Sequence, residues 1–227
     1  MNLPHRSVLL LAGTLPVLLA GCRYYDSHHS NGMLASTTSA SGEIAINRMG
    51  GGIDVENAPH GATLNTMGGG VHVGNVASFA RIKTMGGGVE VDHATGSVDA
   101  TTMGGGITVS TAEGPVKATS MGGGITVREV GTSNQERDIR LISKGGTIEL
   151  TVPKDFPMDV KITLAYTRTD RQYHIVQHSG LDVHESSEWD SSQGTPSKYI
   201  RARGLVGTGL NRVEIETVNG DVILNQE

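Results

Sequence analysis

The sequence predicts an all-β protein built as a parallel β-solenoid with 18-residue coils. The first observation is a phrase, Met-Gly-Gly-Gly followed by Ile or Val, that recurs every 18 residues, beginning at Met49, Met67, Met85, Met103 and Met121. The second is that apolar residues keep fixed offsets from each methionine. Self-similarity at a short, constant period is typical of repeat architectures.

Each repeat contains two short apolar runs with a period of two, split by the glycines. One run places apolar residues five and three positions before the methionine: Ile44 and Ile46, Ala62 and Leu64, Ala80 and Ile82, Val98 and Ala100, Val116 and Ala118. The other places them four and six positions after it: Ile53 and Val55, Val71 and Val73, Val89 and Val91, Ile107 and Val109, Ile125 and Val127. Alternation of this kind predicts two β-strands per coil.

A third inward-facing position is expected nine residues after the methionine, at Ala58, Val76, Ala94, Ala112 and Val130. Helix is excluded because three successive glycines would cost a helix roughly 3 kcal/mol relative to alanine. One coil cannot bury its apolar face alone, whereas stacked coils, each adding strands at about 4.8 Å, can do so.

The pattern continues in two degenerate copies, which have Lys144 and Val218 in the place of the methionine. The middle glycine of the three persists in these copies, so we predict that the turn requires it, through positive φ or through close approach of the next coil. The predicted turn glycines are Gly51, Gly69, Gly87, Gly105, Gly123, Gly146 and Gly220.

The N-terminus resembles a bacterial lipoprotein signal. Arg6 precedes a short apolar run, and Leu19-Ala20-Gly21-Cys22 resembles a lipobox, which predicts a signal peptide over 1–21 and lipidation of Cys22. Arg23 follows the cysteine, which by resemblance to Gram-negative lipoproteins favours the outer membrane, on its periplasmic or cell-surface face. The polar stretch up to residue 42 is expected to be a flexible tether.

The predicted solenoid domain spans 43–227, with strict repeats over 43–150, an insertion over 151–212 and a final coil over 213–227. Within the insertion, alternation from Met158 to Tyr166 predicts a long strand. Further strands are expected around Tyr173 to Gln177 and from Lys198 to Ala202, with a loop from His178 to Ser197 and a turn at Gly204, Gly207 and Gly209. The insertion is expected to broaden the last coils or to cover the end of the solenoid, whose open edges would otherwise invite polymerisation.

Short phrases of the degenerate copies carry a family resemblance. Thr217-Val-Asn-Gly-Asp-Val-Ile-Leu224 and Leu150-Thr-Val-Pro-Lys154 resemble the bacterial adhesin-like family of β-strand-repeat proteins, over roughly residues 43–227. The five identical Met-Gly-Gly-Gly phrases depart from that family's looser pattern. The resemblance implies a non-enzymatic envelope protein and supplies no catalytic residues.

The net charge and the clusters of polar residues argue against several classes of function. The net charge is −5 with no basic run, so nucleic-acid binding is not expected. The row Asp54, His72, Glu90, Thr108 and Thr126 is interpreted as a solvated face rather than as the acidic cleft of a polysaccharide lyase or hydrolase. A hexapeptide acyltransferase repeat is excluded because Pro59, Gly61 and Glu113 fall where apolar residues would be needed.

Metal sites are weakly indicated and no cofactor is predicted. His60, His72 and His93 occupy different coil positions, and the acidic residues Asp182, Glu185, Glu188 and Asp190 match no known calcium loop. The stacked methionines Met49, Met67, Met85, Met103 and Met121 are expected to fill gaps at a corner, although thioether ladders also bind Cu(I). Two function classes therefore remain: a lipid-anchored interaction module for an envelope protein or glycan, and a metal- or stress-linked periplasmic lipoprotein.

Overall fold

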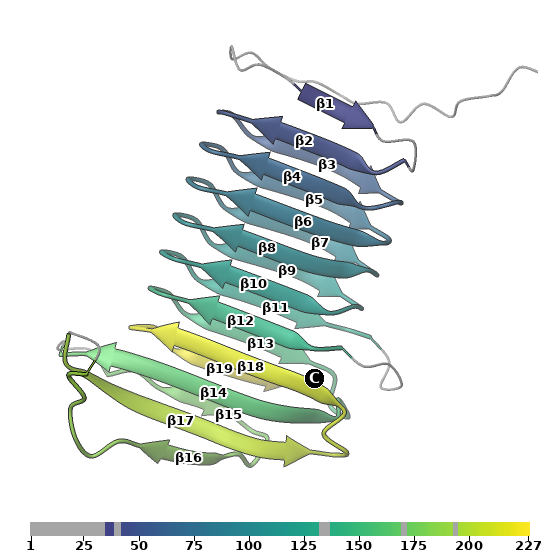
Figure 1. The fold of residues 1–227 in the computed structure, drawn as a ribbon. Helices are drawn as coiled ribbons and strands as arrows, with labels where there is room; N and C mark the ends of the chain where they lie inside the picture. The colour runs from purple at the N-terminus through teal and green to yellow at the C-terminus, as the bar shows by residue number, and fades with distance from the viewer. Residues whose placement is uncertain (1–34, 39–41, 132–136, 169–171, 193–194) are drawn as a thin grey trace, which may run out of the picture.

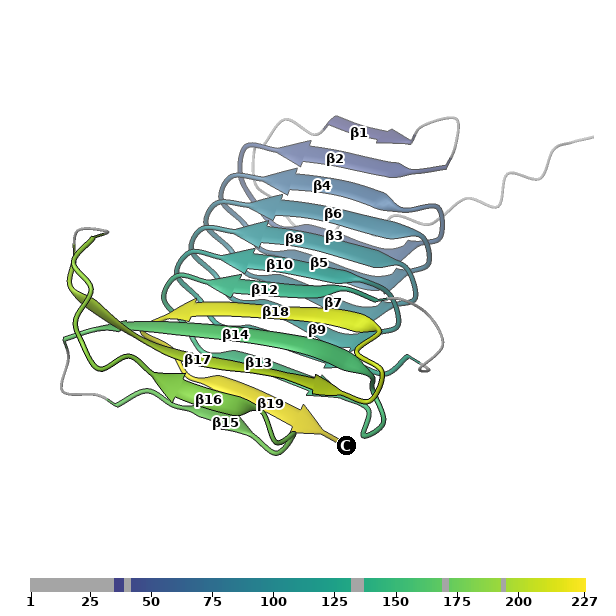
Figure 2. The ribbon, with the colours of Figure 1, turned by 60° about the horizontal axis from the view of Figure 1, so that its bottom comes forward.

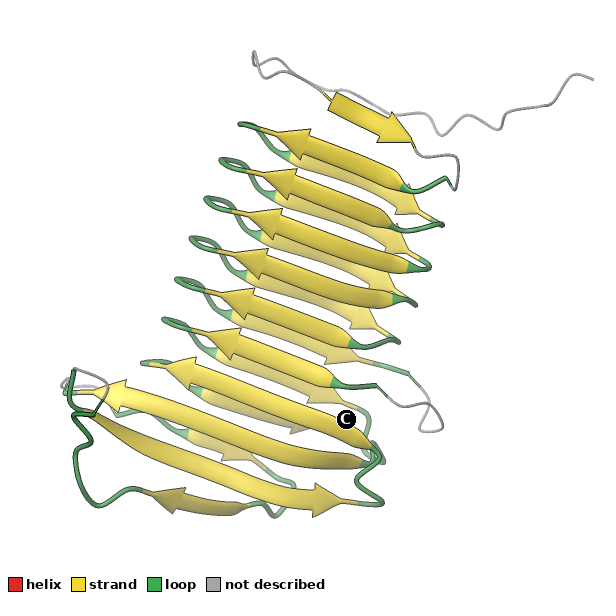
Figure 3. Cartoon of the chain, in the orientation of Figure 1, coloured by secondary structure: helices red, strands yellow, loops and turns green. Residues whose placement is uncertain are grey.

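The described part of the chain forms two large β-sheets wound into a solenoid (Figure 1). The computed structural model describes residues 35–38, 42–131, 137–168, 172–192 and 195–227, and none of these residues is helical (Figure 3). The all-β, repeat-based fold that the sequence predicts is thereby confirmed. No helix among the described residues is long and apolar enough to span a membrane.

Sheet A contains eleven strands among the described residues. In spatial order they are β1 (Ala35–Thr38), β2 (Ile44–Arg48), β4 (Ala62–Thr66), β6 (Phe79–Thr84), β8 (Ser97–Thr102), β10 (Val116–Ser120), β12 (Ile139–Ser143), β18 (Asn211–Val218), β14 (Met158–Thr167), β17 (Ser197–Val206) and β16 (Asp182–Glu185). Pairing is parallel from β2 to β14, whereas β1, β17 and β16 pair antiparallel with their neighbours.

Sheet B contains eight described strands, and all of its pairings are parallel. In spatial order they are β15 (Ile175–Gln177), β19 (Val222–Gln226), β13 (Ile148–Val152), β11 (Ile125–Glu129), β9 (Ile107–Ala112), β7 (Val89–Ala94), β5 (Val71–Val76) and β3 (Ile53–Ala58). Each coil thus gives one strand to each sheet (Figure 2).

The strands stack in the register that the 18-residue period predicts. Ile53 pairs with Val71, and Val71 with Val89, and the same offset continues through Ile107 to Ile125. Equivalent side chains therefore form continuous rows. The apolar rows face inward between the sheets and are almost fully buried, which gives the strict coils an aliphatic core. Phe79 is only half-buried and lies outside this core.

One predicted core position is wrong. Val130 is 39% exposed, and Glu129 takes the inward position opposite Ala112. The other strict coils carry an extra residue in the sheet B strand, so their burial alternation breaks before the last position. Strand β11 lacks that residue and alternates regularly to its end, which brings the glutamate inward.

The last coil does not stack where its position in the sequence suggests. Strand β18 pairs with β12 on one side and with β14 on the other, and β19 lies likewise between β13 and β15. The C-terminal strands therefore enter the stack between the sixth coil and the insertion. The insertion forms an additional layer that covers the end of the solenoid (Figure 1).

Several expectations for the insertion need correction. The long strand is confirmed as β14, but the predicted loop from His178 to Ser197 contains strand β16. The strand expected at Lys198 to Ala202 is longer and includes Gly204, which leaves Gly207 and Gly209 in the turn, both with positive φ. At the other end, four residues of the predicted tether form β1 and pair with β2.

Candidate functional site

The turn between the two strands of each coil is held by close backbone contact with the preceding coil. A Cβ added at Gly69, Gly87 or Gly105 would lie 2.0–2.4 Å from backbone atoms of the turn before it. The same holds at Gly123, Gly146 and Gly220, at 2.4, 2.5 and 2.1 Å. Of the seven predicted turn glycines, Gly51 alone has positive φ, so room for the neighbouring coil is the requirement at the other six.

A ladder of buried hydroxyls fastens these turns to one another. It contains Thr66, Thr84, Thr102, Ser120, Ser143 and Thr217, each in the position just before the methionine or its substitute. The Thr102 hydroxyl accepts from the N–H of Gly105 in its own coil at 3.2 Å and donates to the carbonyl of Gly87 in the preceding coil at 2.7 Å. This ladder was not predicted from the sequence. The period of two does indicate it, because the residues five and three positions before the methionine face inward, and the residue one position before it should do the same.

The methionines lie on the outside of the same turn. Their side chains are exposed to between 44% and 75%, so the expectation that they fill gaps at a packed corner is wrong. Alternation gives the physical reason, because the residue that follows an inward-facing threonine on a strand faces outward. Met49, Met67, Met85, Met103 and Met121 occur once per coil, at a rise of about 4.8 Å. We call these five residues the methionine edge.

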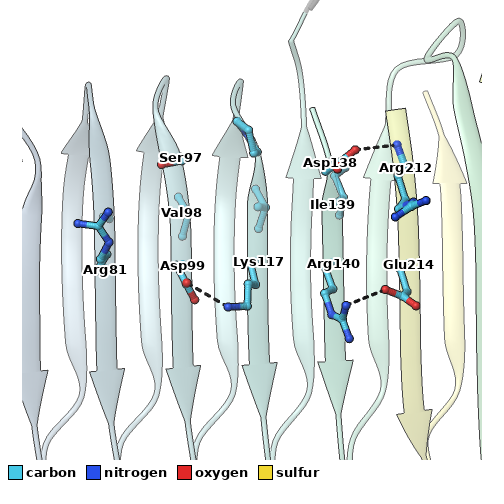
Figure 4. A pocket seen from close by; sticks show the side chains of 13 residues that line it. Arg81, Ser97, Val98, Asp99, Lys117, Asp138, Ile139, Arg140, Arg212 and Glu214 are labelled. Atoms are coloured by element: carbon cyan, nitrogen blue, oxygen red, sulfur yellow. Dashed lines mark hydrogen bonds and ion pairs between the residues drawn. The ribbon is translucent and has the colours of Figure 1, made fainter. Parts of the chain in front are cut away.

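A charged row crosses the outer face of sheet A. Its members pair rung by rung, and carboxylates alternate with pairs of cations: Arg81, Asp99, Lys117, Arg140, Glu214, Lys161, Arg203 and Asp182. The first five side chains line a shallow groove of about 440 Å³ over β6, β8, β10, β12 and β18 (Figure 4). We call the eight residues the sheet A row. This row was not predicted from the sequence.

Ion pairs link neighbours within the sheet A row. Lys117 Nζ lies 3.2 Å from Asp99 Oδ2, and Glu214 accepts from Arg140 and Lys161 at 3.0 Å each. The hydrogen bond from Lys161 is the main reason why the pKa of Glu214 lies below its usual value. The Arg81 guanidinium instead lies over the Phe79 ring, 4.6 Å from its centre. No described carboxylate forms an ion pair with Arg81.

The outer face of sheet B has the opposite charge in its N-terminal half. Four exposed carboxylates stand there, on Asp54, Glu56, Glu90 and Asp92. His72 lies between two of them, with Nδ1 3.0 Å from Asp54 and Nε2 3.1 Å from Asp92. The hydrogen bond to Asp54 is the largest reason why the pKa of His72 is raised. The register of Asp54, His72, Glu90, Thr108 and Thr126 is confirmed.

A buried ion pair marks the place where the strict repeats end. Glu129 Oε1 accepts from the N–H of Gly131 at 3.0 Å and lies 3.5 Å from Nη1 of Arg137, and both side chains are almost fully buried. Glu129 Oε2 has no hydrogen-bond partner among the described residues. Burial raises the pKa of Glu129 to about 7. The backbone N–H of Arg137 donates to Asn211 at 2.7 Å, which connects this site to the last coil.

The insertion gathers aromatic and cationic side chains at the far ends of its strands. Trp189 meets Tyr166 edge-on with ring centres 5.9 Å apart, and Arg168 and Lys198 lie 5.0 and 5.6 Å from its ring centre. The Tyr166 hydroxyl donates to Glu185, a bond that raises the pKa of Tyr166 to about 12. These contacts hold β14, β16 and the following loop together.

Two sequence predictions concern metal ions and lipidation. Cys22, the predicted lipidation site, lies outside the described residues. Among the described residues, no three His, Cys, Asp or Glu side chains are grouped so that they could hold a metal ion. Asp182 and Glu185, from the acidic stretch considered for calcium, lie on β16.

Comparison with protein families, with curated proteins and with solved structures finds no match for this chain. The resemblance to the adhesin-like family therefore stays a prediction.

Proposed function

We propose that this protein is a non-enzymatic, lipid-anchored scaffold of the bacterial cell envelope, which binds an envelope protein along the methionine edge. The predicted anchor is Cys22, and the predicted location is the outer membrane, facing the periplasm or the cell surface. The outer face of sheet B supports a non-enzymatic role, because its carboxylates are exposed to solvent and His72 is paired with two of them, Asp54 and Asp92.

The observation that carries this proposal is the exposure of the methionine edge. Five large apolar side chains stand in one line, each 44% or more exposed. Contiguous exposed apolar surface often marks an interaction site, whereas single exposed apolar residues do not. Methionine also suits binding, because its unbranched thioether adapts to the shape of a partner. The glycines beside it carry no side chains, so a partner can approach the backbone closely.

Site-specific cross-linking tests this surface. A photoreactive amino acid placed at Met103 in living cells should give a discrete adduct, whereas the same residue at Thr126, which is exposed on sheet B, should not. The adduct should persist when Met85 and Met121 are changed to Leu and disappear when they are changed to Gln. Equal adducts from both positions, or survival of the adduct in the Gln variant, would refute the proposed edge.

The anchor is tested separately. Changing Cys22 to Ser should move the protein from the membrane fraction to the soluble fraction, because lipid attached to one sulfur is the only predicted membrane contact. A C22S protein that still floats with membranes would contradict the lipoprotein assignment. A conservative change in the predicted tether, Ser27→Ala, serves as the control and should leave the protein membrane-bound.

A second candidate function uses the same residues. The exposed thioethers of adjacent coils are about one rung apart, and flexible side chains allow two of them to reach one soft cation such as Cu(I). Replacing Met67, Met85 and Met121 with Leu, in the protein that carries the photoreactive residue in place of Met103, removes the sulfur and keeps the apolar surface. Loss of Cu(I) binding with retention of the cross-link would show both properties. Absence of tight Cu(I) binding in the unmodified protein would dismiss the metal function.

A further inference from the structure

The two outer faces of the solenoid carry opposite charge, which the overall net charge of −5 conceals. The sheet A row contains five cations and three carboxylates. Lys83, Arg201 and Arg212, on the same face, add three cations. Glu216, Asp159 and Asp138 add three carboxylates, which leaves eight cations against six carboxylates. On sheet B, by contrast, the exposed carboxylates of Asp54, Glu56, Glu90 and Asp92 dominate the N-terminal half. An acidic protein thus presents one face with excess positive charge.

The charges of the sheet A row follow a period of three rungs. From β8 onward, each carboxylate is followed by two cations: Asp99 by Lys117 and Arg140, then Glu214 by Lys161 and Arg203. At about 4.8 Å per rung, the period is about 14 Å. A ligand that lies across the strands therefore meets, in each period, two cations that can bind its anionic groups and one carboxylate that can accept hydrogen bonds from it.

The cations of this row remain available to a ligand. Lys117 and Asp99 are 56% and 47% exposed, and ion pairs at such exposure contribute little and exchange readily with other anions. Arg81 forms no ion pair with a described carboxylate, and its guanidinium lies over the Phe79 ring at one end of the groove (Figure 4). The groove itself is lined by polar and apolar atoms of five adjacent strands.

We propose that the sheet A row binds an extended anionic polysaccharide of the uronate class, laid across the strands over β6 to β17. The inference deepens the proposed function, on which it rests, by naming a ligand for a second surface of the scaffold. Carboxylates of the sugar acids pair with Arg81, Lys117 and Arg140. The hydroxyls between them donate to Asp99 and Glu214, so the ligand supplies both kinds of group that the row requires.

The interspersed carboxylates argue for this ligand over other polyanions. A polyuronate and a DNA strand both carry an anion on every unit, but each uronate unit also has free hydroxyls that can donate to Asp99 and Glu214, whereas the phosphodiester backbone of DNA has none. Aromatic side chains on which bases could stack are also missing from the described groove lining. A polyuronate tolerates the carboxylates because its hydroxyls donate to them, and one pyranose unit is close in length to one rung.

Binding of size-defined oligogalacturonate to the soluble C22S protein, measured by calorimetry, tests this proposal. The double variant Lys117→Gln and Arg140→Gln should bind about tenfold more weakly, since each exposed charge contributes modestly. Asp99→Ala should also weaken binding, because it removes the carboxylate that accepts from the sugar hydroxyls, and stronger binding of this variant would contradict that role. A matched double variant, Arg128→Gln and Lys144→Gln, removes two exposed cations away from the row and should change affinity by less than about twofold.

The dependence of binding on salt, and the binding of other ligands, provide further tests of this proposal. Binding of the unmodified protein should weaken as salt rises, and the K117Q/R140Q variant should show a smaller salt dependence. A neutral cello-oligosaccharide of the same length should not bind. Equal loss in the matched control, equal binding of the neutral sugar, tighter binding of duplex DNA, or no binding at all would each overturn the proposal.

The two surfaces are separable in this design. Gln substitutions along the methionine edge should abolish the protein cross-link and leave oligogalacturonate binding unchanged. If the sugar fails to bind while the cross-link persists, the polysaccharide proposal fails alone. If the sugar binds and the cross-link is absent, the methionine edge fails alone. Melting temperatures of all variants within a few degrees of the unmodified protein establish that each loss is local.

Discussion

The hydrogen bonds that link neighbouring strands differ between the five strict coils, residues 43–131, and the C-terminal region, residues 137–227. In the strict coils, side-chain hydrogen bonds repeat with the period of the sequence, as between Asn65 and Asn47 or between Asn75 and Asn57, each pair 18 residues apart. In the C-terminal region, the connecting bonds join remote segments: Thr167 bonds to Asn219 across 52 residues, and Arg137 to Asn211 across 74.

The cores of the two regions also differ in size. The strict coils bury mainly Val, Ile and Ala, whereas the C-terminal region buries large side chains such as Phe156, Met158 and Leu164. A repeated coil has neighbours above and below it, so small residues and backbone ladders are sufficient. No described strand lies beyond the last layer. It needs larger side chains and antiparallel strands to protect the edge of the stack.

The two regions also differ in how far apart in the sequence their paired strands lie, which affects the order in which they fold. Contacts between strict coils are local and can propagate from one coil to the next, whereas β18 and β19 must find their places between β12 and β14 and between β13 and β15. Long-range pairing of this kind is slow, because loop closure must precede the contacts. We expect the strict coils to form first and the C-terminal strands to complete the stack.

The largest expected effect comes from filling a turn in the strict region. Gly105→Val should reduce the free energy of unfolding by about 2–4 kcal/mol, because a Cβ at this position would lie 2.4 Å from the backbone of Gly88. Hydrogen exchange should quicken first over residues 85–127, with the C-terminal region still protected. Uniform loosening would mean that the two regions unfold as one unit.

Neighbouring glycines provide graded controls for that change. A Cβ at Gly104 would approach Gly86 O to 2.9 Å, and one at Gly106 would approach Gly124 O to 3.1 Å, so alanine at either position should destabilise less. Gly50 has open space around it, and alanine there should leave stability nearly unchanged.

The second effect concerns the junction between the regions. Because burial raises the folded-state pKa of Glu129 to about 7 from 4.5, the folded protein holds a proton that the unfolded chain loses. Stability should therefore fall as pH rises from about 4.5 to about 7, by up to about 3 kcal/mol from this group. The hydrogen bond from Gly131 and then the charge of Arg137 oppose this rise of the pKa, and Glu113 adds to it. Urea unfolding at pH 5 and pH 8 measures the difference.

Variants isolate this carboxyl from the other acids. Glu129→Gln should flatten the pH dependence between these values, whereas Glu90→Gln, at an exposed position, should leave it unchanged. A slope that survives the E129Q change would place its origin elsewhere in the molecule.

The third effect tests whether the hydroxyl ladder serves both regions equally. Thr102→Val leaves the carbonyl of Gly87 and the N–H of Gly105 without their partner and should destabilise by about 1–3 kcal/mol. Thr217→Val removes a 2.7 Å bond to Gly146 within the C-terminal region and should have a similar effect. Thr108→Val, on the exposed face, is the control. A loss at Thr102 alone would confine the ladder's contribution to the strict region.

The smallest expected effect is on the pH dependence of stability, to which His72 in the strict coils and Glu214 in the C-terminal region contribute in opposite directions. The raised pKa of His72 gives stability that is fully present below about pH 6.5 and is lost as pH rises through its folded-state value. The lowered pKa of Glu214 gives stability that is present above about pH 4.5 and is lost as pH falls further. Each contribution should be under about 1 kcal/mol because both sites are near the surface. Unfolding of His72→Gln and Glu214→Gln across this range would show it, and parallel responses would refute it.

The sequence by itself determined the period, the two strands per coil and the need for the middle glycine. These features depend on local rules: alternation fixes which side chains face inward, and a glycine that persists while its neighbours change marks a crowded backbone. The same alternation also predicts an inward Thr102 and an outward Met103. The expectation that methionine packs into a corner was preferred to this pattern and was wrong.

Only the tertiary structure decided the position of the last coil, the inward turn of Glu129 and the sheet A row. Each depends on which strands become neighbours. Lys161 and Glu214 are 53 residues apart and meet because the final coil enters the stack beside β14. Local periodicity carries no information about such an order, since any parallel arrangement of these strands buries the same alternating residues. The choice between arrangements is made by how the insertion closes the end of the solenoid.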